Sequence, residues 1–250
     1  MNAEHALDAK RPARERQHDT IVLIPTYNEA DNVQPIVRAV LAAAPVDVMV
    51  LDDNSPDGTG VLAEALATND PRVRVLHRPK KEGLGRAYLE GMAQALAAGY
   101  TRICEMDADF SHPPSVLPKL LAASERVDLV LGSRNVPGGG TKNWPLHRRL
   151  ISQGGSLYAR TILGVPVRDL TGGFKVFHRR VLEAIDLPSV RSNGYAFQIE
   201  MTYRTVRRGF SIEEVPFVFV ERESGVSKMS RGIVLEAVLM CPKLRLGGTS

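Results

Sequence analysis

Residues 20–58 read TIVLIPTYNEADNVQPIVRAVLAAAPVDVMVLDDNSPDG. Two short apolar runs, Thr20 to Pro25 and Val46 to Leu51, enclose a segment from Asn32 to Ala44 whose apolar residues recur with helical spacing. A strand, a helix and a second strand in this order form a β-α-β unit with parallel strands. This stretch therefore predicts an α/β fold.

The same alternation continues along the chain. Further strands are expected at Val73–His77, Thr101–Met106, Leu129–Gly132 and Val215–Val220, and helices at Thr59–Leu66, Gly85–Ala98, Pro114–Ala123, 145–163 and Ser230–Met240. The pattern predicts a mostly parallel sheet flanked by helices, with amphipathic helices near the C-terminus. We expect one domain over residues 20–240, between a disordered tail at 1–19 and a C-terminal tail at 241–250.

The composition is that of a globular protein, with 44% apolar and 24% charged residues in 250. The net charge of +4 is too small to indicate nucleic-acid binding, and it fits an anionic ligand or an anionic membrane surface. Two cysteines form neither a disulfide framework nor a metal signature, and residues 1–19 contain no signal-peptide apolar region. No apolar run approaches the roughly 18 residues of a spanning helix. We expect a cytoplasmic protein that docks on a membrane from one side.

Polar clusters follow five of the expected strands. They are Pro25-Thr-Tyr-Asn-Glu29, Asp52-Asp-Asn-Ser-Pro-Asp-Gly58, His77-Arg-Pro-Lys-Lys81, Asp107-Ala-Asp109 and Gly132-Ser-Arg134. In an open parallel sheet, ligands bind outside the carboxyl ends of the strands. The five clusters are therefore expected along one edge.

Asp107 and Asp109 follow the fourth expected strand. Two carboxylates two residues apart suit a hard cation such as Mg²⁺ or Mn²⁺, which also takes oxygens from a substrate diphosphate. The alternative is a pair of helix caps for a helix that begins near Ser111-His-Pro-Pro114. The position after a strand favours the metal site. Asp52 and Asp53 are expected both to shape a turn and to bind a base or ribose.

Basic residues occur near several of the same strand ends, where they are either phosphate ligands or ordinary surface charges. They are Lys81, Arg134, Arg148, Arg149, Arg222 and Lys228. The chain lacks a complete dinucleotide-binding glycine motif, a Walker A sequence and a G-x-S-x-G motif. The lone histidines His112 and His147 are expected at a helix start or at the surface rather than as ligands.

A family resemblance rests on the strand-end motifs together with Gly83-Leu-Gly-Arg-Ala-Tyr88, and on more specific motifs further along. The specific motifs are Asn143-Trp-Pro145, Arg148-Arg-Leu-Ile-Ser152, Asp169-Leu-Thr-Gly-Gly-Phe174, Gly194-Tyr-Ala-Phe-Gln198 and Glu221-Arg-Glu-Ser-Gly-Val-Ser-Lys228. Over residues 20 to 240 the chain resembles the inverting family-2 glycosyltransferases of GT-A fold, and within them the dolichol-phosphate and polyprenol-phosphate mannose synthases.

The resemblance implies site residues by position. The nucleotide-sugar set is Pro25, Tyr27, Glu29, Leu51, Asp53, Lys81, Asp107, Ala108, Asp109, Arg134, Arg222 and Lys228. The lipid-phosphate set is Arg134, Arg148, Ser152, Arg222 and Lys228, and the catalytic set is Asp107, Asp109, Arg134 and Arg148. The metal set is Asp107, Asp109 and Ser111, although relatives carry Gln at the third position. Ser111 therefore binds the ion directly, through water, or not at all.

The activity implied is inverting transfer of mannose from GDP-mannose to a polyprenyl monophosphate, with Mg²⁺ or Mn²⁺. The implied partners are these two substrates, a membrane surface and a membrane-anchored protein, because some relatives carry transmembrane helices. Three alternatives stay open: a glucosyl or aminosugar transferase on the same lipid, a processive polysaccharide synthase, and an inactive membrane-surface adaptor. The chain lacks the Gln-x-x-Arg-Trp sequence that a processive polysaccharide synthase would need.

Overall fold

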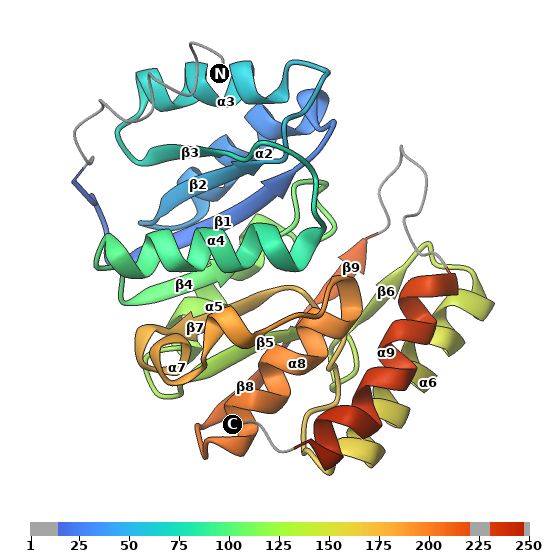
Figure 1. The fold of residues 1–250 in the computed structure, drawn as a ribbon. Helices are drawn as coiled ribbons and strands as arrows, with labels where there is room; N and C mark the ends of the chain where they lie inside the picture. The colour runs from blue at the N-terminus through green and yellow to red at the C-terminus, as the bar shows by residue number, and fades with distance from the viewer. Residues whose placement is uncertain (1–14, 221–230, 248–250) are drawn as a thin grey trace.

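The protein is described by a computed structural model that covers residues 15–220 and 231–247, without the side chains of 147, 148 and 231–237. A seven-stranded sheet has the order β3-β2-β1-β4-β7-β5-β8 (Figure 1). Its strands are β1 (Thr20–Thr26), β2 (Asp47–Asp52), β3 (Val73–His77), β4 (Arg102–Glu105), β5 (Leu129–Ser133), β7 (Lys175–His178) and β8 (Ile212–Pro216). Only β7 runs antiparallel to its neighbours in this sheet. The predicted mostly parallel α/β fold is confirmed.

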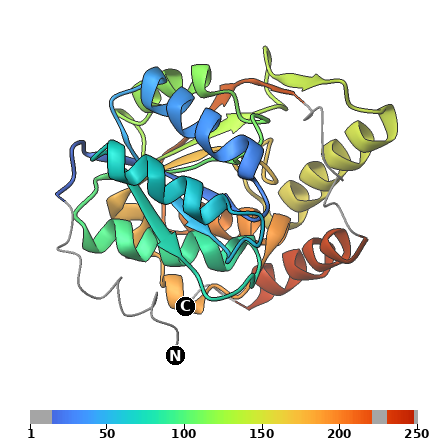
Figure 2. The same cartoon turned by 90° about the horizontal axis from the view of Figure 1, so that it is seen from above.

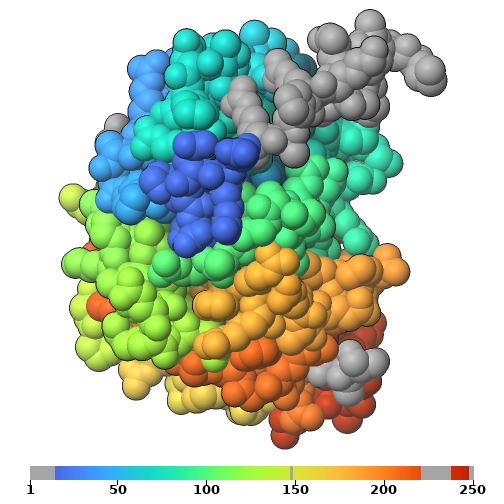
Figure 3. All heavy atoms as spheres, turned by 90° about the vertical axis from the view of Figure 1, so that its left-hand side faces the viewer, coloured from blue at the N-terminus to red at the C-terminus, as the bar shows by residue number. Residues whose placement is uncertain are grey.

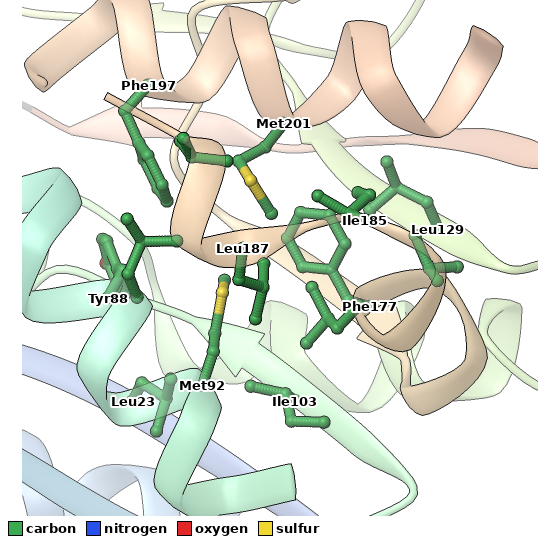
Figure 4. Packing of buried hydrophobic residues seen from close by; sticks show 14 of the residues in the cluster. Leu23, Tyr88, Met92, Ile103, Leu129, Phe177, Ile185, Leu187, Phe197 and Met201 are labelled. Carbon is green, nitrogen blue, oxygen red and sulfur yellow. The ribbon is translucent and has the colours of Figure 1, made fainter. Parts of the chain in front are cut away.

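Helices cover both faces of the sheet. The helices are α2 (Ala30–Ala43), α3 (Thr59–Asn69), α4 (Leu84–Ala97), α5 (Leu117–Ala123), α6 (Leu146–Leu163), α7 (Arg179–Ala184), α8 (Gly194–Arg207) and α9 (Arg231–Leu246), with 3-10 turns at Pro114–Val116 and Leu187–Ser189. Side chains alternate along each strand, so Val22 and Ile24 pack with α2, α3 and α5, whereas Ile21 and Leu23 pack with α4, α7 and α8. Figure 4 shows the second core, where Tyr88 of α4 stacks on Phe197 of α8 with ring centroids 6.0 Å apart.

The expected strand Val215–Val220 is in fact two strands. β8 ends at Pro216, which lacks the N–H that would continue the ladder. β9 (Val218–Val220) pairs instead with β6 (Gly140–Lys142) in a separate two-stranded parallel sheet. The loop 134–139 and the segment after β8 are therefore held together outside the main sheet.

The last helix is longer than the sequence predicts. α9 continues to Leu246 although Pro242 lies inside it, so the expected helix end at Met240 is wrong. Cys241 is fully buried in the core and Arg245 donates to the Leu163 carbonyl of α6 at 3.0 Å, which explains the continuation. At the N-terminus, residues 1–14 lie outside the described residues. Residues 15–19 lie on the surface (dark blue in Figure 3), where the Gln17 N–H donates to Asp47 at 2.9 Å.

Candidate active site

The predicted polar clusters lie along one edge of the sheet. Strands β1, β2, β3 and β4 pair in parallel, and β5 has the same direction because β7 runs antiparallel to both β4 and β5. The carboxyl ends of these five strands therefore meet at the same edge. Each predicted cluster begins where one of them ends.

Asp107 and Asp109 lie in a tight turn after β4. The Asp109 carboxylate accepts the Ser111 N–H at 3.1 Å, and Phe110 between them has a left-handed φ of +60°. Neither aspartate caps the following 3-10 turn, whose N-cap is Pro113 and has no side-chain hydrogen bond. The capping alternative is therefore wrong, since the carboxylates serve the turn itself.

The turn offers oxygen atoms that suit a hard cation. Asp107 and Asp109 are half-buried, and the Ser111 hydroxyl is buried without a hydrogen-bond partner among the described residues. No group of three or more His, Cys, Asp and Glu side chains that could hold a metal ion occurs in the described part of the chain. The two carboxylates fit Mg²⁺ or Mn²⁺ with substrate phosphates and water as further ligands.

His112 lies just before the 3-10 turn at Pro114–Val116, which is one of its two expected places, but it is buried rather than at the surface. Its ring is 2% exposed and stacks on Phe174 with centroids 4.9 Å apart. Its Nδ1 accepts the Asp107 N–H at 3.0 Å. Burial lowers the pKa of His112, although the charges of Asp107 and Asp109 oppose this shift. Because Nδ1 accepts an N–H, this nitrogen carries no hydrogen, and the ring belongs to the acidic turn.

Arg134 lies beyond β5 and forms a buried ion pair that the sequence did not predict. Its Nε and Nη2 donate to the two carboxylate oxygens of Asp169 at 2.7 and 2.6 Å, and Nη2 also donates to Thr171 at 3.0 Å. Trp144 and Phe219 lie over the guanidinium, with centroids 5.6 and 5.7 Å away. Among the described residues, these contacts leave Nη1 as the guanidinium nitrogen for a ligand.

A small pocket opens beside Arg134. Its lining consists of Arg134, Asn135, Gly140, Thr141, Trp144, Arg149, Ser152 and Gln153. The structure thus brings together two predicted phosphate ligands, Arg134 and Ser152, and adds Arg149. Arg148 lies in α6 with its side chain outside the described atoms, and Arg222 and Lys228 lie outside the described residues.

The nucleotide side of the edge lies at β1, β2 and β3. The Lys81 ammonium lies 3.9 Å from the ring centroid of Tyr27. Pro25 and Glu29 are half-buried in the same β1 segment, but Leu51 is fully buried in the core, so only its main chain can contact a ligand. Tyr27 and Lys81 thus form a cationic aromatic face.

Asp53 accepts a hydrogen bond from Arg78, a buried residue that the sequence analysis did not select. Burial raises the pKa of Asp53, and Arg78 opposes the rise. Asp52 accepts both the N–H and the hydroxyl of Ser55, at 3.2 and 2.6 Å. Asp52 therefore shapes the turn, and the guanidinium of Arg78 holds the carboxylate of Asp53.

Known proteins resemble this chain along most of its length. Residues 21–186 match the profile of Glycosyl transferase family 2. An undecaprenyl-phosphate mannosyltransferase of Micrococcus luteus is 51% identical over 220 residues, which cover 88% of this chain and 90% of that protein. A polyprenol monophosphomannose synthase of Mycolicibacterium smegmatis is 51% identical over 222 residues, which cover 88% and 84%.

The fold also resembles a solved enzyme. Glucosyl-3-phosphoglycerate synthase from Mycobacterium tuberculosis, in complex with Mn²⁺, UDP and glucosyl-3-phosphoglycerate, superposes with a TM-score of 0.66 at 20% identity. The match covers 97% of this chain and 82% of that one. At this identity the likeness concerns the fold alone.

Proposed function

Because the chain belongs to glycosyl transferase family 2, we propose that it transfers mannose from GDP-mannose to a polyprenyl monophosphate with inversion at the anomeric carbon. The two relatives at 51% identity are named as mannosyltransferases of undecaprenyl phosphate and polyprenol, which supports this donor sugar and this acceptor. The choice of GDP as the nucleotide of the donor follows from the family resemblance of the sequence motifs.

The observation that carries the proposal is an acidic turn and a basic pocket on one sheet edge. Asp107 and Asp109 follow β4, and Arg134 follows β5, with only β7 between these strands. A donor diphosphate with a cation suits the first site, and an anionic acceptor suits the second. This arrangement supports binding of the donor diphosphate and the acceptor phosphate at adjacent positions.

The acceptor explains why the site needs no general base. The second pKa of a phosphate monoester is near 6, so the acceptor is mostly a dianion at pH 7. One of its oxygens forms the bond to the anomeric carbon while the bond from that carbon to the donor diphosphate breaks, and GDP leaves with the electron pair. The protein's task is to position two anions and to offset their charge.

The residues divide this task by position. Asp107, Asp109 and Ser111 would hold Mg²⁺ or Mn²⁺, which offsets the charge of the departing diphosphate when bound. Pro25, Tyr27, Glu29, the Leu51 main chain, Asp53 and Lys81 would bind the nucleotide, with Ala108 at the diphosphate. Arg134, Arg148, Ser152, Arg222 and Lys228 would bind phosphates.

The lipid acceptor requires contact with a membrane, and α6 and α9 supply a suitable surface. Large exposed apolar side chains gather there: Leu146, Leu150, Ile151, Leu157, Val238, Leu239 and Leu246. Basic Arg149 and Arg160 accompany them on α6, which contains no acidic residue. Within the described ranges, no helix combines the length and apolarity needed to cross a bilayer. The proposal is peripheral docking on the cytoplasmic face, alone or beside a membrane-anchored partner.

Radiolabelled sugar transfer tests the function. Purified protein is incubated with polyprenyl phosphates of several lengths and with GDP-mannose, UDP-glucose or a UDP-aminosugar in turn. The expected result is labelled lipid from GDP-mannose only, formed with Mg²⁺ or Mn²⁺ and lost with a chelator. Preference for a UDP-sugar would establish the glucosyl or aminosugar transferase. Absence of turnover with every donor would favour the inactive membrane-surface adaptor.

The Asp109→Ala variant tests the acidic turn in the same assay. It removes one of the two carboxylates, and we expect transfer to fall by at least about 100-fold because charge stabilisation of this kind contributes that much. Val61→Ala on α3, at a solvent-exposed position, is the matched control. Substantial turnover by Asp109→Ala with metal present would contradict the metal assignment.

A further inference from the structure

We propose that His112 is a positioning residue that sets both the main chain and the carboxylate of Asp107. This inference rests on the proposed role of Asp107 in holding the cation. The Asp107 N–H donates to Nδ1 of His112 at 3.0 Å, and Nε2 of the same ring lies 3.8 Å from Oδ2 of Asp107. One imidazole thus faces one aspartate with both of its nitrogens.

The first contact fixes the tautomer of the ring. Since Nδ1 accepts the N–H of Asp107, the hydrogen of the neutral imidazole is on Nε2. That N–H therefore belongs to the nitrogen nearest the Asp107 carboxylate. At 3.8 Å it orients the carboxylate electrostatically rather than through a direct hydrogen bond.

The ring of His112 is held in place by aromatic neighbours. It stacks on Phe174 at an interplanar angle of 14°, and the rings of Phe217 and Phe219 are edge-on to it, with centroids 5.9 and 6.0 Å from its centroid. Phe174 directly precedes β7, Phe217 links β8 to β9, and Phe219 lies in β9. A ring enclosed in this way cannot rotate without displacing them.

The same aromatic cluster reaches the basic pocket. Phe219 contacts Trp144 with centroids 5.1 Å apart, and both rings lie over the guanidinium of Arg134. The cluster of His112, Phe174, Phe217, Phe219 and Trp144 therefore joins the acidic turn to the pocket as one packed body. His112 is the member of this body that contacts Asp107.

A measurement of metal binding tests the positioning role of His112 independently of enzymatic turnover. Free Mn²⁺ is followed by electron paramagnetic resonance during titration of the full-length protein with GDP present. His112→Phe keeps an aromatic ring and removes both nitrogens, and we expect its Mn²⁺ affinity to fall about 10-fold or more, as for other residues that orient metal ligands. His112→Asn keeps an acceptor at the Nδ1 position and should recover part of the loss.

Phe177→Leu is the matched control, because it removes packing from the core on the other face of the sheet and leaves the rings around His112 unchanged. Its melting temperature should fall while its Mn²⁺ affinity stays within about twofold of the wild type. Equal Mn²⁺ affinity of wild type and His112→Phe would overturn the inference. If His112→Phe does not fold, His112→Asn decides, and an affinity equal to wild type overturns it.

Different results would overturn the cation assignment and the role of His112. If the wild-type protein with GDP binds no Mn²⁺, the cation assignment itself is wrong and this inference is overturned with it. If the wild type binds Mn²⁺ and Asp109→Ala does not, the assignment stands whatever His112→Phe does. The substitution at His112 then reports on positioning alone.

Discussion

Asp169 fixes the orientation of Arg134 at the edge of the basic pocket. The Asp169 carboxylate is fully buried and accepts the Nε, Nη2 and main-chain N–H groups of Arg134. Burial would raise the pKa of Asp169, but the adjacent guanidinium holds it below its usual range. Glu214 supports this arrangement by accepting the Arg168 and Asp169 N–H groups at 2.8 and 2.9 Å.

Asp169→Asn should therefore weaken use of the acceptor. The amide has no charge and only one acceptor oxygen, and its NH₂ group replaces an oxygen that accepts an N–H of Arg134. We therefore expect the KM for polyprenyl phosphate to rise about 10-fold or more, with the KM for GDP-mannose nearly unchanged. Loss of one partner from a buried ion pair should also lower the free energy of unfolding by about 3 kcal/mol. Steady-state kinetics with each substrate varied in turn measure the first effect, and urea unfolding measures the second.

Asp128→Asn is the matched control for that variant. Asp128 is also a buried carboxylate paired with an arginine, Arg180, but it precedes β5 at the opposite edge of the sheet. The Asp128→Asn variant should lower the free energy of unfolding without changing the KM for polyprenyl phosphate or for GDP-mannose. A similar rise in acceptor KM for both variants would mean that general loosening, not the orientation of Arg134, causes the effect.

At the scale of residues, the sequence locates charges but not their partners. Asp107, Asp109 and Arg134 could be selected because they follow strands. His112 and Arg78 could not be selected, since their importance depends on burial beside Asp107 and Asp53. Asp169 is 35 residues from Arg134, and only the fold brings the two side chains together.

At the scale of elements, one carboxylate joins the start of β5 to the start of β8. Asp128 accepts the N–H and the hydroxyl of Ser211 at 2.8 and 2.6 Å, while its own N–H donates to the Ser211 carbonyl at 3.1 Å. Burial raises the pKa of Asp128, but the hydrogen bonds from Ser211 and the charge of Arg180 outweigh this, and the net shift is downward.

The lowered pKa gives a pH-dependent contribution to stability. A carboxyl group whose pKa is lower in the folded than in the unfolded state stabilises the fold above its unfolded pKa, and this contribution disappears as the pH falls through the folded value. Asp128→Ala should lower the free energy of unfolding by about 2 kcal/mol at pH 7, because charged hydrogen bonds are lost. The difference from wild type should shrink as the pH falls below about 4. Denaturant unfolding at pH 7, 5 and 3 measures it, and a constant difference would contradict the assignment.

The elements that the sequence predicted share an amphipathic or apolar pattern, and those it missed do not. α8 was not predicted because apolar residues occur at every second position, at Phe197, Ile199 and Met201, and this alternation is typical of a strand rather than of a helix. Nearly all residues from Ala196 to Thr205 are buried in the structure, polar ones included. Glu200 and Arg204 pair within it at 2.6 Å. β7 contains the buried Lys175, and β6 and β9 have three residues each, too few for a recognisable period.

At the scale of the whole molecule, α6 and α9 form a pair of helices at one flank, where α9 also packs against α8. They lie side by side at one flank in Figure 1 and in Figure 2, and the Tyr158 hydroxyl donates to the Val238 carbonyl at 3.0 Å. Leu146, Leu150 and Leu157 are spaced by four and seven residues, so they share one face of α6, with exposed fractions of 71%, 59% and 62%. An exposed apolar face of this kind typically marks an interaction surface.

Vesicle flotation tests whether that surface binds a bilayer. Wild-type protein should float with phosphatidylglycerol vesicles, less with neutral phosphatidylcholine vesicles and less at high salt, because Arg149 and Arg160 add an electrostatic attraction that salt screens. Leu150→Ser with Leu157→Ser removes two exposed leucines that would insert into the bilayer. Since each contributes about 1.5 kcal/mol or more to insertion, the partition coefficient should fall at least about 100-fold. Val61→Ser, at a 75% exposed position on α3 away from α6 and α9 (Figure 1), should float like the wild type. Equal flotation of the double variant would assign the membrane contact to another surface, and a wild type that stays in solution with every vesicle would exclude docking by these helices alone.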